Sequence, residues 1–170
     1  TTSLSVGGDY RLGEQWVFGG NLGGSSGNID FSGTLGKQKS KASQVTAYAS
    51  FSPTASTYLS ATVSYQASRF NFTRDNGAQE LSFSTPRGHA LGLSLAGGRD
   101  FVMGPWSVGP YLRWDSISTS LNAFDEAGSP SAVSVAAQRV QSDAINLGAQ
   151  TQLSIPVSWG IVLPYVRLEW

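Results

Sequence analysis

Apolar and polar residues alternate with a period of two along most of the chain. Between residues 59 and 68 the odd positions are aliphatic or aromatic and the even positions are Ser, Thr or Gln, and residues 145–155 show a similar split. This period places successive side chains on opposite faces of a β-strand, whereas a helix requires a period of 3.6. The apolar set includes Leu59, Ala61, Val63, Ile145, Leu147 and Leu153, and the polar set includes Ser60, Thr62, Gln150 and Gln152.

Residues that favour turns divide these alternating stretches into eight predicted strands. Several are longer than the usual strand of about 5 to 6 residues, and they are long enough to cross a bilayer at a tilt, which takes about 9 to 11 residues. The predicted strands are residues 2–12, 16–31, 44–52, 57–73, 88–102, 106–124, 139–155 and 159–170.

The connections between these strands alternate in length. The short ones fall at residues 13–15, 53–56, 104–105 and 156–158, and the long polar ones at residues 32–43, 74–87 and 125–138. Such alternation puts every tight turn at one end of the sheet and every long loop at the other. The sequence therefore predicts one all-β domain over residues 1–170, an antiparallel up-and-down transmembrane β-barrel. Its apolar set would face lipid and its polar set the lumen.

Aromatic residues flank the predicted short turns. Amphipathic aromatic rings prefer the headgroup level of a bilayer, so these residues predict an interfacial girdle at the turn end of the barrel. Aromatic enrichment at ordinary strand ends is the alternative explanation. The predicted girdle consists of Tyr10, Trp16, Phe51, Tyr58, Phe101, Trp106 and Trp159.

Two segments repeat one motif: residues 108–115 read VGPYLRWD and residues 162–170 read VLPYVRLEW. Proline lacks a backbone donor, so each copy predicts a local irregularity in strand pairing. The tyrosine, arginine and carboxylate of each copy share one face. We expect that face to line the lumen, where charges hydrate a pore and pair with each other or with a threaded segment. The predicted lumen charges are Asp9, Arg11, Arg113, Asp115, Arg167 and Glu169.

The amino-acid composition argues against several classes of function. Eleven basic and eleven acidic residues cancel, which argues against general nucleic-acid binding. The chain has no cysteine and one histidine, His89, so it offers no thiolate or multi-histidine metal site, and we expect no cofactor. A G-x-S-x-G string at residues 23–27 lies in a predicted strand without the helix that a nucleophile elbow needs, so no catalytic residue is predicted.

The three lysines of the chain, Lys37, Lys39 and Lys41, fall in a predicted long loop. As point charges they could contact lipopolysaccharide phosphates, or they could simply be solvated.

Several motifs, in order, resemble the C-terminal β-barrel translocator domain of bacterial autotransporters. They are GGDYRLGEQWVFGGNLGGSSGNIDFSG (7–33), AGGRDF (96–101), GPYLRW (109–114), AFDEAG (123–128) and LPYVRLEW (163–170). The resemblance implies an outer-membrane barrel of type V secretion that exports its own N-terminal passenger. It also implies the barrel-assembly machinery as a partner, and action without metal or cofactor. A chain placed in the outer membrane is further expected to contact outer-membrane lipid and lipopolysaccharide.

Members of that family form a twelve-stranded barrel, and by resemblance this chain corresponds to strands two to nine. The turn pattern agrees, because four short turns and three long loops leave both chain ends at the loop side. We therefore expect the outer edges of the first and last strands either to lack a partner or to be joined to each other.

Two other interpretations fit the same alternation. One is an independent eight-stranded outer-membrane barrel of adhesin or porin type, since about eight strands can close on their own. The other is a soluble lipocalin-like barrel, which binds a ligand and has its apolar side chains inside and its polar ones outside.

Overall fold

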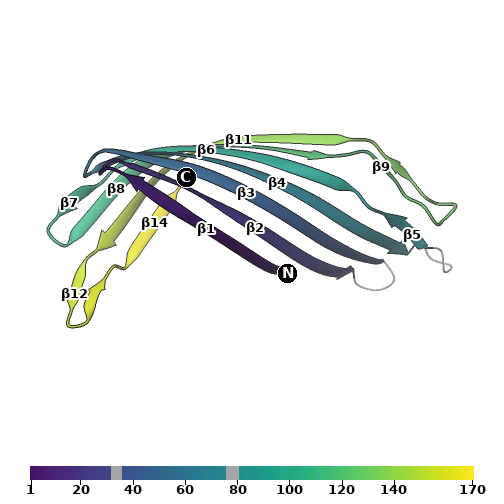
Figure 1. Ribbon diagram of the computed structural model, residues 1–170, viewed down its shortest axis with the longest axis horizontal. Coiled ribbons are helices and arrows are strands. Elements are labelled where there is room, and N and C mark those ends of the chain that lie inside the picture. Colours follow the sequence, from purple (N-terminus) through teal and green to yellow (C-terminus); the bar gives the residue numbers. More distant parts are fainter. Residues whose placement is uncertain (32–35, 76–80) are drawn as a thin grey trace.

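A computed structural model describes residues 1–31, 36–75 and 81–170, and eight long antiparallel strands in it form one arched sheet (Figure 1). Each inner strand of this path pairs with the strand before it and the strand after it, and each end strand pairs with one neighbour, which is the predicted up-and-down order. The path runs through β1 (Thr2–Leu12), β2 (Trp16–Phe31), β3 (Gly36–Thr54), β4 (Thr57–Asp75), β6 (Arg87–Arg99), β8 (Trp106–Leu121), β11 (Gln138–Leu153) and β14 (Tyr165–Glu169).

Six short strands lie at the two ends of this sheet. At the loop end, β5 (Leu81–Ser84) pairs with β4, and β9 (Phe124–Asp125) pairs with β10 (Ser134–Val135). At the turn end, β7 (Phe101–Met103) pairs with β8, and β12 (Ile155–Val157) pairs with β13 (Gly160–Val162) in a hairpin that projects from the sheet (Figure 1).

Two of the predicted short turns contain a glycine in the left-handed region. Gly13 has a φ of 65° and Gly104 a φ of 62°. Gly104 lies in a two-residue turn between Met103 and Trp106, and Gly13 begins a three-residue turn between Leu12 and Trp16. Hairpin turns of both lengths commonly contain a residue with positive φ.

The structure extends the third strand well beyond its prediction. β3 begins at Gly36 rather than at residue 44, and Lys37, Lys39 and Lys41 pair with β2 on one side and β4 on the other. Their assignment to a loop was therefore wrong. Lysine and serine alternate here with the period of a strand, but the segment lacks the apolar face on which the prediction depended.

Both copies of the repeated motif carry the irregularity that proline predicts. The pairing of β6 and β7 with β8 skips Arg99 and Asp100, which lie across from Pro110. In the second copy the chain leaves strand geometry at Leu163 and Pro164, so the predicted last strand is split into β13 and β14.

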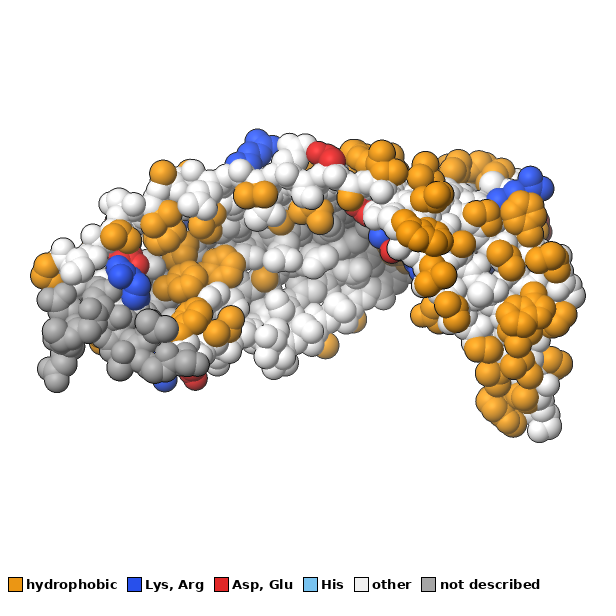
Figure 2. Space-filling model, turned by 180° about the vertical axis from the view of Figure 1, so that it is seen from behind, with side chains coloured by type: hydrophobic (Ala, Val, Ile, Leu, Met, Phe, Trp, Pro, Cys, Tyr) orange, Lys and Arg blue, Asp and Glu red, His pale blue; other side chains and the backbone are white. Residues whose placement is uncertain are grey.

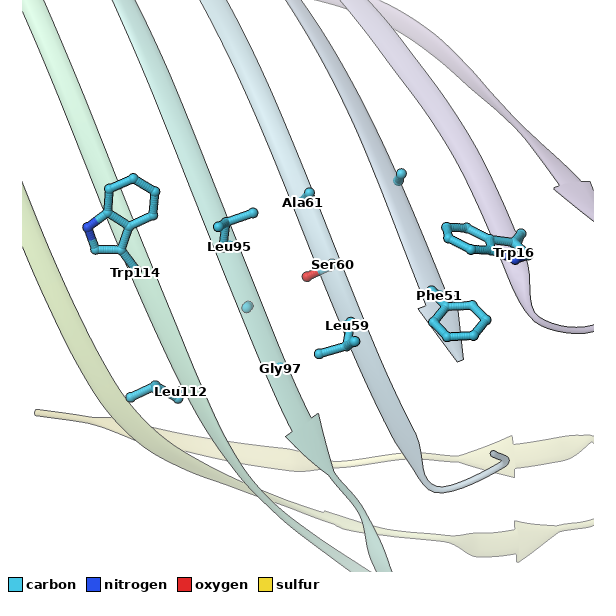
Figure 3. A pocket seen from close by; sticks show the side chains of 11 residues that line it. Trp16, Phe51, Leu59, Ser60, Ala61, Leu95, Gly97, Leu112 and Trp114 are labelled. Carbon is cyan, nitrogen blue, oxygen red and sulfur yellow. The ribbon is translucent and has the colours of Figure 1, made fainter. Parts of the chain in front are cut away.

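The register separates two faces along every long strand. Trp16, Phe51, Leu59, Gly97, Leu112 and Leu147 lie opposite one another in one row across six strands. The next row on the same face contains Phe18, Ala49, Ala61, Leu95, Trp114 and Ile145. Figure 3 shows several of these side chains together beside a groove of about 650 Å³. This convex face is apolar and exposed.

The other, concave face carries the polar set. Its buried side chains include Tyr111, Ser82 and Ser84. The hollow beneath the arch is visible in Figure 2, which also shows hydrophobic side chains gathered over the β12–β13 hairpin. The predicted orientation of the apolar and polar sets is therefore confirmed by the register.

These faces decide between the three interpretations. The lipocalin-like barrel is wrong, because its apolar side chains would line the concave face. The independent eight-stranded barrel is also not what the structure shows, since β1 pairs only with β2 and β14 only with β11 among the described residues. In the described parts of the chain no helix is long and apolar enough to span a membrane.

A charge pair ties the loop end together. Nε and Nη2 of Arg74 on β4 donate to the two carboxylate oxygens of Glu126, which follows β9. The guanidinium holds the pKa of the Glu126 carboxyl below its usual range. A backbone pairing of Phe83 with Ala127 lies beside this contact, so the β8–β11 connection is docked onto the end of β4 and β5.

Candidate functional site on the concave face

The turn half of the concave face carries a network of charged side chains. Tyr111, Arg113 and Asp115 occupy alternate positions of β8, and Arg167 and Glu169 occupy alternate positions of β14. β11 lies between these strands and pairs with both of them. The period of two thus sends both copies of the Tyr-Arg-carboxylate motif to the same face, as predicted.

Both arginines of the repeat pair with carboxylates. Arg113 lies 2.8 Å from Asp115 and 3.0 Å from Glu169, measured from its Nε and Nη1 atoms. Arg167 Nη2 lies 2.7 Å from Glu169 Oε1. Glu169 therefore joins the two copies of the motif across β11. The expected contact of each arginine with a carboxylate is present.

Asp115 also receives hydrogen bonds from neighbouring strands. Ser94 Oγ on β6 donates to it at 2.6 Å, and Asn146 Nδ2 on β11 donates at 2.9 Å. Four strands thereby contribute to one network. It borders a hollow of about 560 Å³ whose other walls include Thr62 and Gln66.

Tyr111 is the hub of the network. The residue is 4% exposed, its hydroxyl donates to Glu169, and Arg167 Nε donates to that hydroxyl. The Arg167 guanidinium also lies over the ring, 4.5 Å from its centroid, which is cation–π geometry.

A glycine makes room for this tyrosine. Gly148 of β11 lies directly between Tyr111 and Glu169 in the register. A Cβ atom at Gly148 would lie 2.3 Å from Cζ of Tyr111, closer than side-chain atoms can approach. The ring can cross β11 and reach Glu169 only because residue 148 has no side chain.

The same arrangement recurs twice more on the concave face. Tyr48 lies opposite Gly19 and Tyr58 lies opposite Gly98, and in each pair a Cβ on the glycine would overlap the tyrosine ring. Three tyrosines thus lie across glycines of a neighbouring strand. Each ring lies over the backbone of the glycine opposite it.

The remaining two predicted lumen charges lie apart from this network. Asp9 and Arg11 occupy alternate positions of β1, opposite Gly19 and Val17, and so share the concave face. β1 is at the other edge of the sheet path from β14. No ion pair links either residue to any residue that the structure describes.

Sequence reasoning placed Tyr111 on the lumen face but did not include it, Ser94, Asn146 or Gly148 among the site residues. The repeated motif does contain the tyrosine, two residues before each arginine. The serine, asparagine and glycine carry no signal of their own, because their part in the network depends on strand register.

Six of the seven predicted girdle residues lie outside the concave face. The convex rows at the turn end contain Tyr10, Trp16, Phe51, Phe101 and Trp106, and the Trp16 and Phe51 rings stack at 4.4 Å. Trp159 is 80% exposed in the turn between β12 and β13. The prediction is wrong for Tyr58, whose ring turns to the concave face over Gly98.

The G-x-S-x-G string and the single histidine both lie within strands. Residues 23–27 lie inside β2, paired with both β1 and β3, and His89 lies on β6 with its ring 6.3 Å from that of Tyr65. Within residues 1–31, 36–75 and 81–170, no group of three or more metal-ligating side chains comes together. The concave network thus offers fixed charges and hydrogen-bonding groups.

A model of the family described as the autotransporter beta-domain matches residues 1–170. The chain belongs to the autotransporter β-domain family. Its members are outer-membrane translocator barrels, so the apolar convex face is the lipid-facing one and the location is the bacterial outer membrane.

Solved autotransporter barrels share this fold. The translocator domain of the autotransporter NalP from Neisseria meningitidis superposes with a TM-score of 0.75 at 23% identity, over 98% of this chain and 58% of that one. The β-domain of the Bordetella autotransporter BrkA gives a TM-score of 0.76 at 23% identity, over 99% and 68%.

A relative by sequence is serotype-specific antigen 1 of Mannheimia haemolytica, 25% identical over 150 residues. The match spans 82% of this chain and 16% of the antigen. This autotransporter β-domain chain therefore corresponds to a small part of the length of that relative, and to somewhat more than half of the NalP structure.

Proposed function

We propose that this chain forms part of a translocator barrel that anchors a longer protein in the outer membrane and helps carry its N-terminal passenger to the cell surface. The observation that carries the proposal is the network of Tyr111, Arg113, Asp115, Arg167 and Glu169 on the concave face of a sheet whose convex face is apolar. Charges held in this way keep a lumen hydrated and can pair with a passing polypeptide.

Closure of the barrel requires strands in addition to those described. An open sheet edge is not tolerated in lipid, and both β1 and β14 have one unpaired edge among the described residues. We propose that further strands of the same protein, up to the twelve that the family resemblance implies, join these edges.

The outer aromatic residues would fix the depth of the barrel. Tyr10, Trp16, Phe101 and Trp106 lie on the convex face near the turn end, where we place the periplasmic headgroups. The barrel would be assembled by the barrel-assembly machinery and would contact outer-membrane lipid and lipopolysaccharide. Its action requires no cofactor, metal or catalytic turnover.

The proposal is tested by replacing Arg113 and Arg167 together with glutamine in the complete membrane protein. Loss of two positive charges from the lumen should shift ion selectivity toward cations and reduce passenger display, because the freed carboxylates would repel anions and acidic segments. Membrane insertion should be unchanged, since it depends on the convex face. The reversal potential and conductance of single channels across a salt gradient measure selectivity, surface labelling of the passenger measures display, and resistance of the folded barrel to detergent measures insertion.

A matched control replaces Arg99 and Arg139, which lie on the convex face, with glutamine. Its pore selectivity and passenger display should be those of the wild type. Wild-type conductance and display in the Arg113→Gln/Arg167→Gln variant would show that the ion pairs are structural only.

A further inference from the structure

Three cations face one another on the convex side of the sheet near its loop end. Lys41 on β3 lies directly opposite Arg69 on β4, and Arg69 lies directly opposite Arg87 on β6. All three side chains are exposed. Residues opposite each other on one face of a sheet have Cβ atoms about 4.5 to 5.5 Å apart, so this is a continuous row of positive charge across three strands.

Such a row is unfavourable unless an anion compensates it. Like charges directly opposite one another destabilise a sheet. In the described part of the chain, none of these three cations lies within salt-bridge distance of a carboxylate. The nearby pair of Lys37 with Asp30, at 3.7 Å, belongs to a different row. The row therefore has the composition of a binding site for an external anion.

The site is hollowed. Ser43, Ala67 and His89 lie opposite one another in the convex row one position nearer the membrane, and the small side chains of Ser43 and Ala67 leave space beside the His89 ring. The resulting hollow has a volume of about 520 Å³, with Lys41, Arg69 and Arg87 at its rim. A sugar or phosphate group could lie in such a hollow, and a row of long apolar residues would have filled it.

The position of the site along the strands indicates which anion it binds. The next convex row toward the turn end contains Val45, Tyr65 and Leu91, which begin the apolar, lipid-facing surface. The loop end of an outer-membrane barrel faces the cell exterior. The ligand must therefore present phosphate at the outer surface and acyl chains immediately below it.

We propose that Lys41, Arg69 and Arg87 bind the phosphorylated sugar of lipopolysaccharide, whose acyl chains lie over Val45, Tyr65 and Leu91. Arginine suits this role because its planar guanidinium donates two parallel hydrogen bonds to a phosphate, and Lys41 adds a point charge. Lipopolysaccharide was expected as a partner from the sequence, and this site gives its binding a defined location. It depends on the outer-membrane placement of the chain but does not depend on passenger export.

The test uses the complete membrane protein purified in detergent and titrated with lipopolysaccharide that carries its lipid A phosphates. Replacing Lys41, Arg69 and Arg87 together with glutamine should weaken binding roughly tenfold, since each of three exposed ion pairs contributes a factor of about two to three. The same variant should be at least as stable as the wild type without lipopolysaccharide, because the repulsion within the row is removed.

A matched control replaces Lys37, Lys39 and Arg139 with glutamine. It removes the same charge from the same face, but these residues lie opposite Thr73, Asn71 and Ser120 rather than opposite cations. The control should keep its affinity within about twofold. Equal weakening of binding by both triple variants would overturn the site.

Two further ligands separate the possible sources of the phosphate. Lipopolysaccharide from which the lipid A phosphates have been removed should bind no better to the wild type than to the Lys41, Arg69 and Arg87 variant. Inorganic phosphate alone at millimolar concentration should not displace lipopolysaccharide, and full displacement would contradict a glycolipid site. Passenger display is measured in cells that express each variant. A variant that loses lipopolysaccharide affinity but still displays its passenger would separate this site from the translocator function.

Discussion

Replacing Val63 with arginine is expected to lower the free energy of unfolding of the membrane-inserted barrel by about 2 to 4 kcal/mol, the cost of an arginine on the lipid face near the bilayer midplane. Val63 lies at the centre of the convex apolar run of β4, with Leu59 and Ala61 on one side and Tyr65 and Ala67 on the other. Urea unfolding in lipid vesicles measures the change.

The matched control is the adjacent residue. Thr62 lies on the concave face of the same strand, so Thr62→Arg places the same side chain in the lumen and should change the free energy of unfolding by much less than Val63→Arg. If Thr62→Arg proved the more destabilising of the two, the assignment of lipid and lumen faces would be reversed.

Replacing Gly148 with alanine is expected to cost about 1 to 3 kcal/mol of stability through overpacking. The added Cβ would overlap the Tyr111 ring, whose position is held by hydrogen bonds to Glu169 and from Arg167. The ring can move away only by giving up those contacts. Equilibrium unfolding in vesicles gives the loss, and altered pore conductance should accompany it.

Alanine substitutions at two other glycines serve as comparisons for this loss of stability. At Gly19 a Cβ would overlap Tyr48 to the same extent, but the Tyr48 hydroxyl has no hydrogen bond to the residues described, so its ring can turn aside at lower cost. At Gly8 of β1 a Cβ would meet nothing within 4 Å. The expected order of destabilisation is Gly148→Ala, then Gly19→Ala, then Gly8→Ala. Equal effects at Gly148 and Gly8 would show that the tyrosine contact does not matter.

The alternation of side chains was sufficient to predict most of the fold. Residues 59–68 have one apolar and one polar face, and the structure keeps those faces along the whole of β4. The prediction failed for residues 36–43, where charged and hydroxyl side chains form a strand beyond the apolar surface. Pairing with the extended β2 and β4, rather than burial of an apolar face, holds that segment in the sheet.

The site was predicted only as far as one strand determines it. Parity within each motif places Arg113, Asp115, Arg167 and Glu169 on a common face, but it does not say which strands are neighbours. The contact of Arg113 with Glu169 depends on β11 lying between β8 and β14. For Tyr58, proximity to a turn predicted an interfacial role, whereas its parity and the glycine opposite it place it in the lumen.

The most direct test of the translocator account uses the absence of cysteine from this chain. Single cysteines at Thr62 and Ser94 on the concave face, and at Val63 and Leu95 on the convex face, are introduced into the complete protein with one further cysteine in the passenger. Disulfide cross-linking is then followed while export is stalled. The account predicts cross-links to residues 62 and 94 and none to residues 63 and 95, whereas cross-links to 63 and 95, or to none of the four, would contradict it.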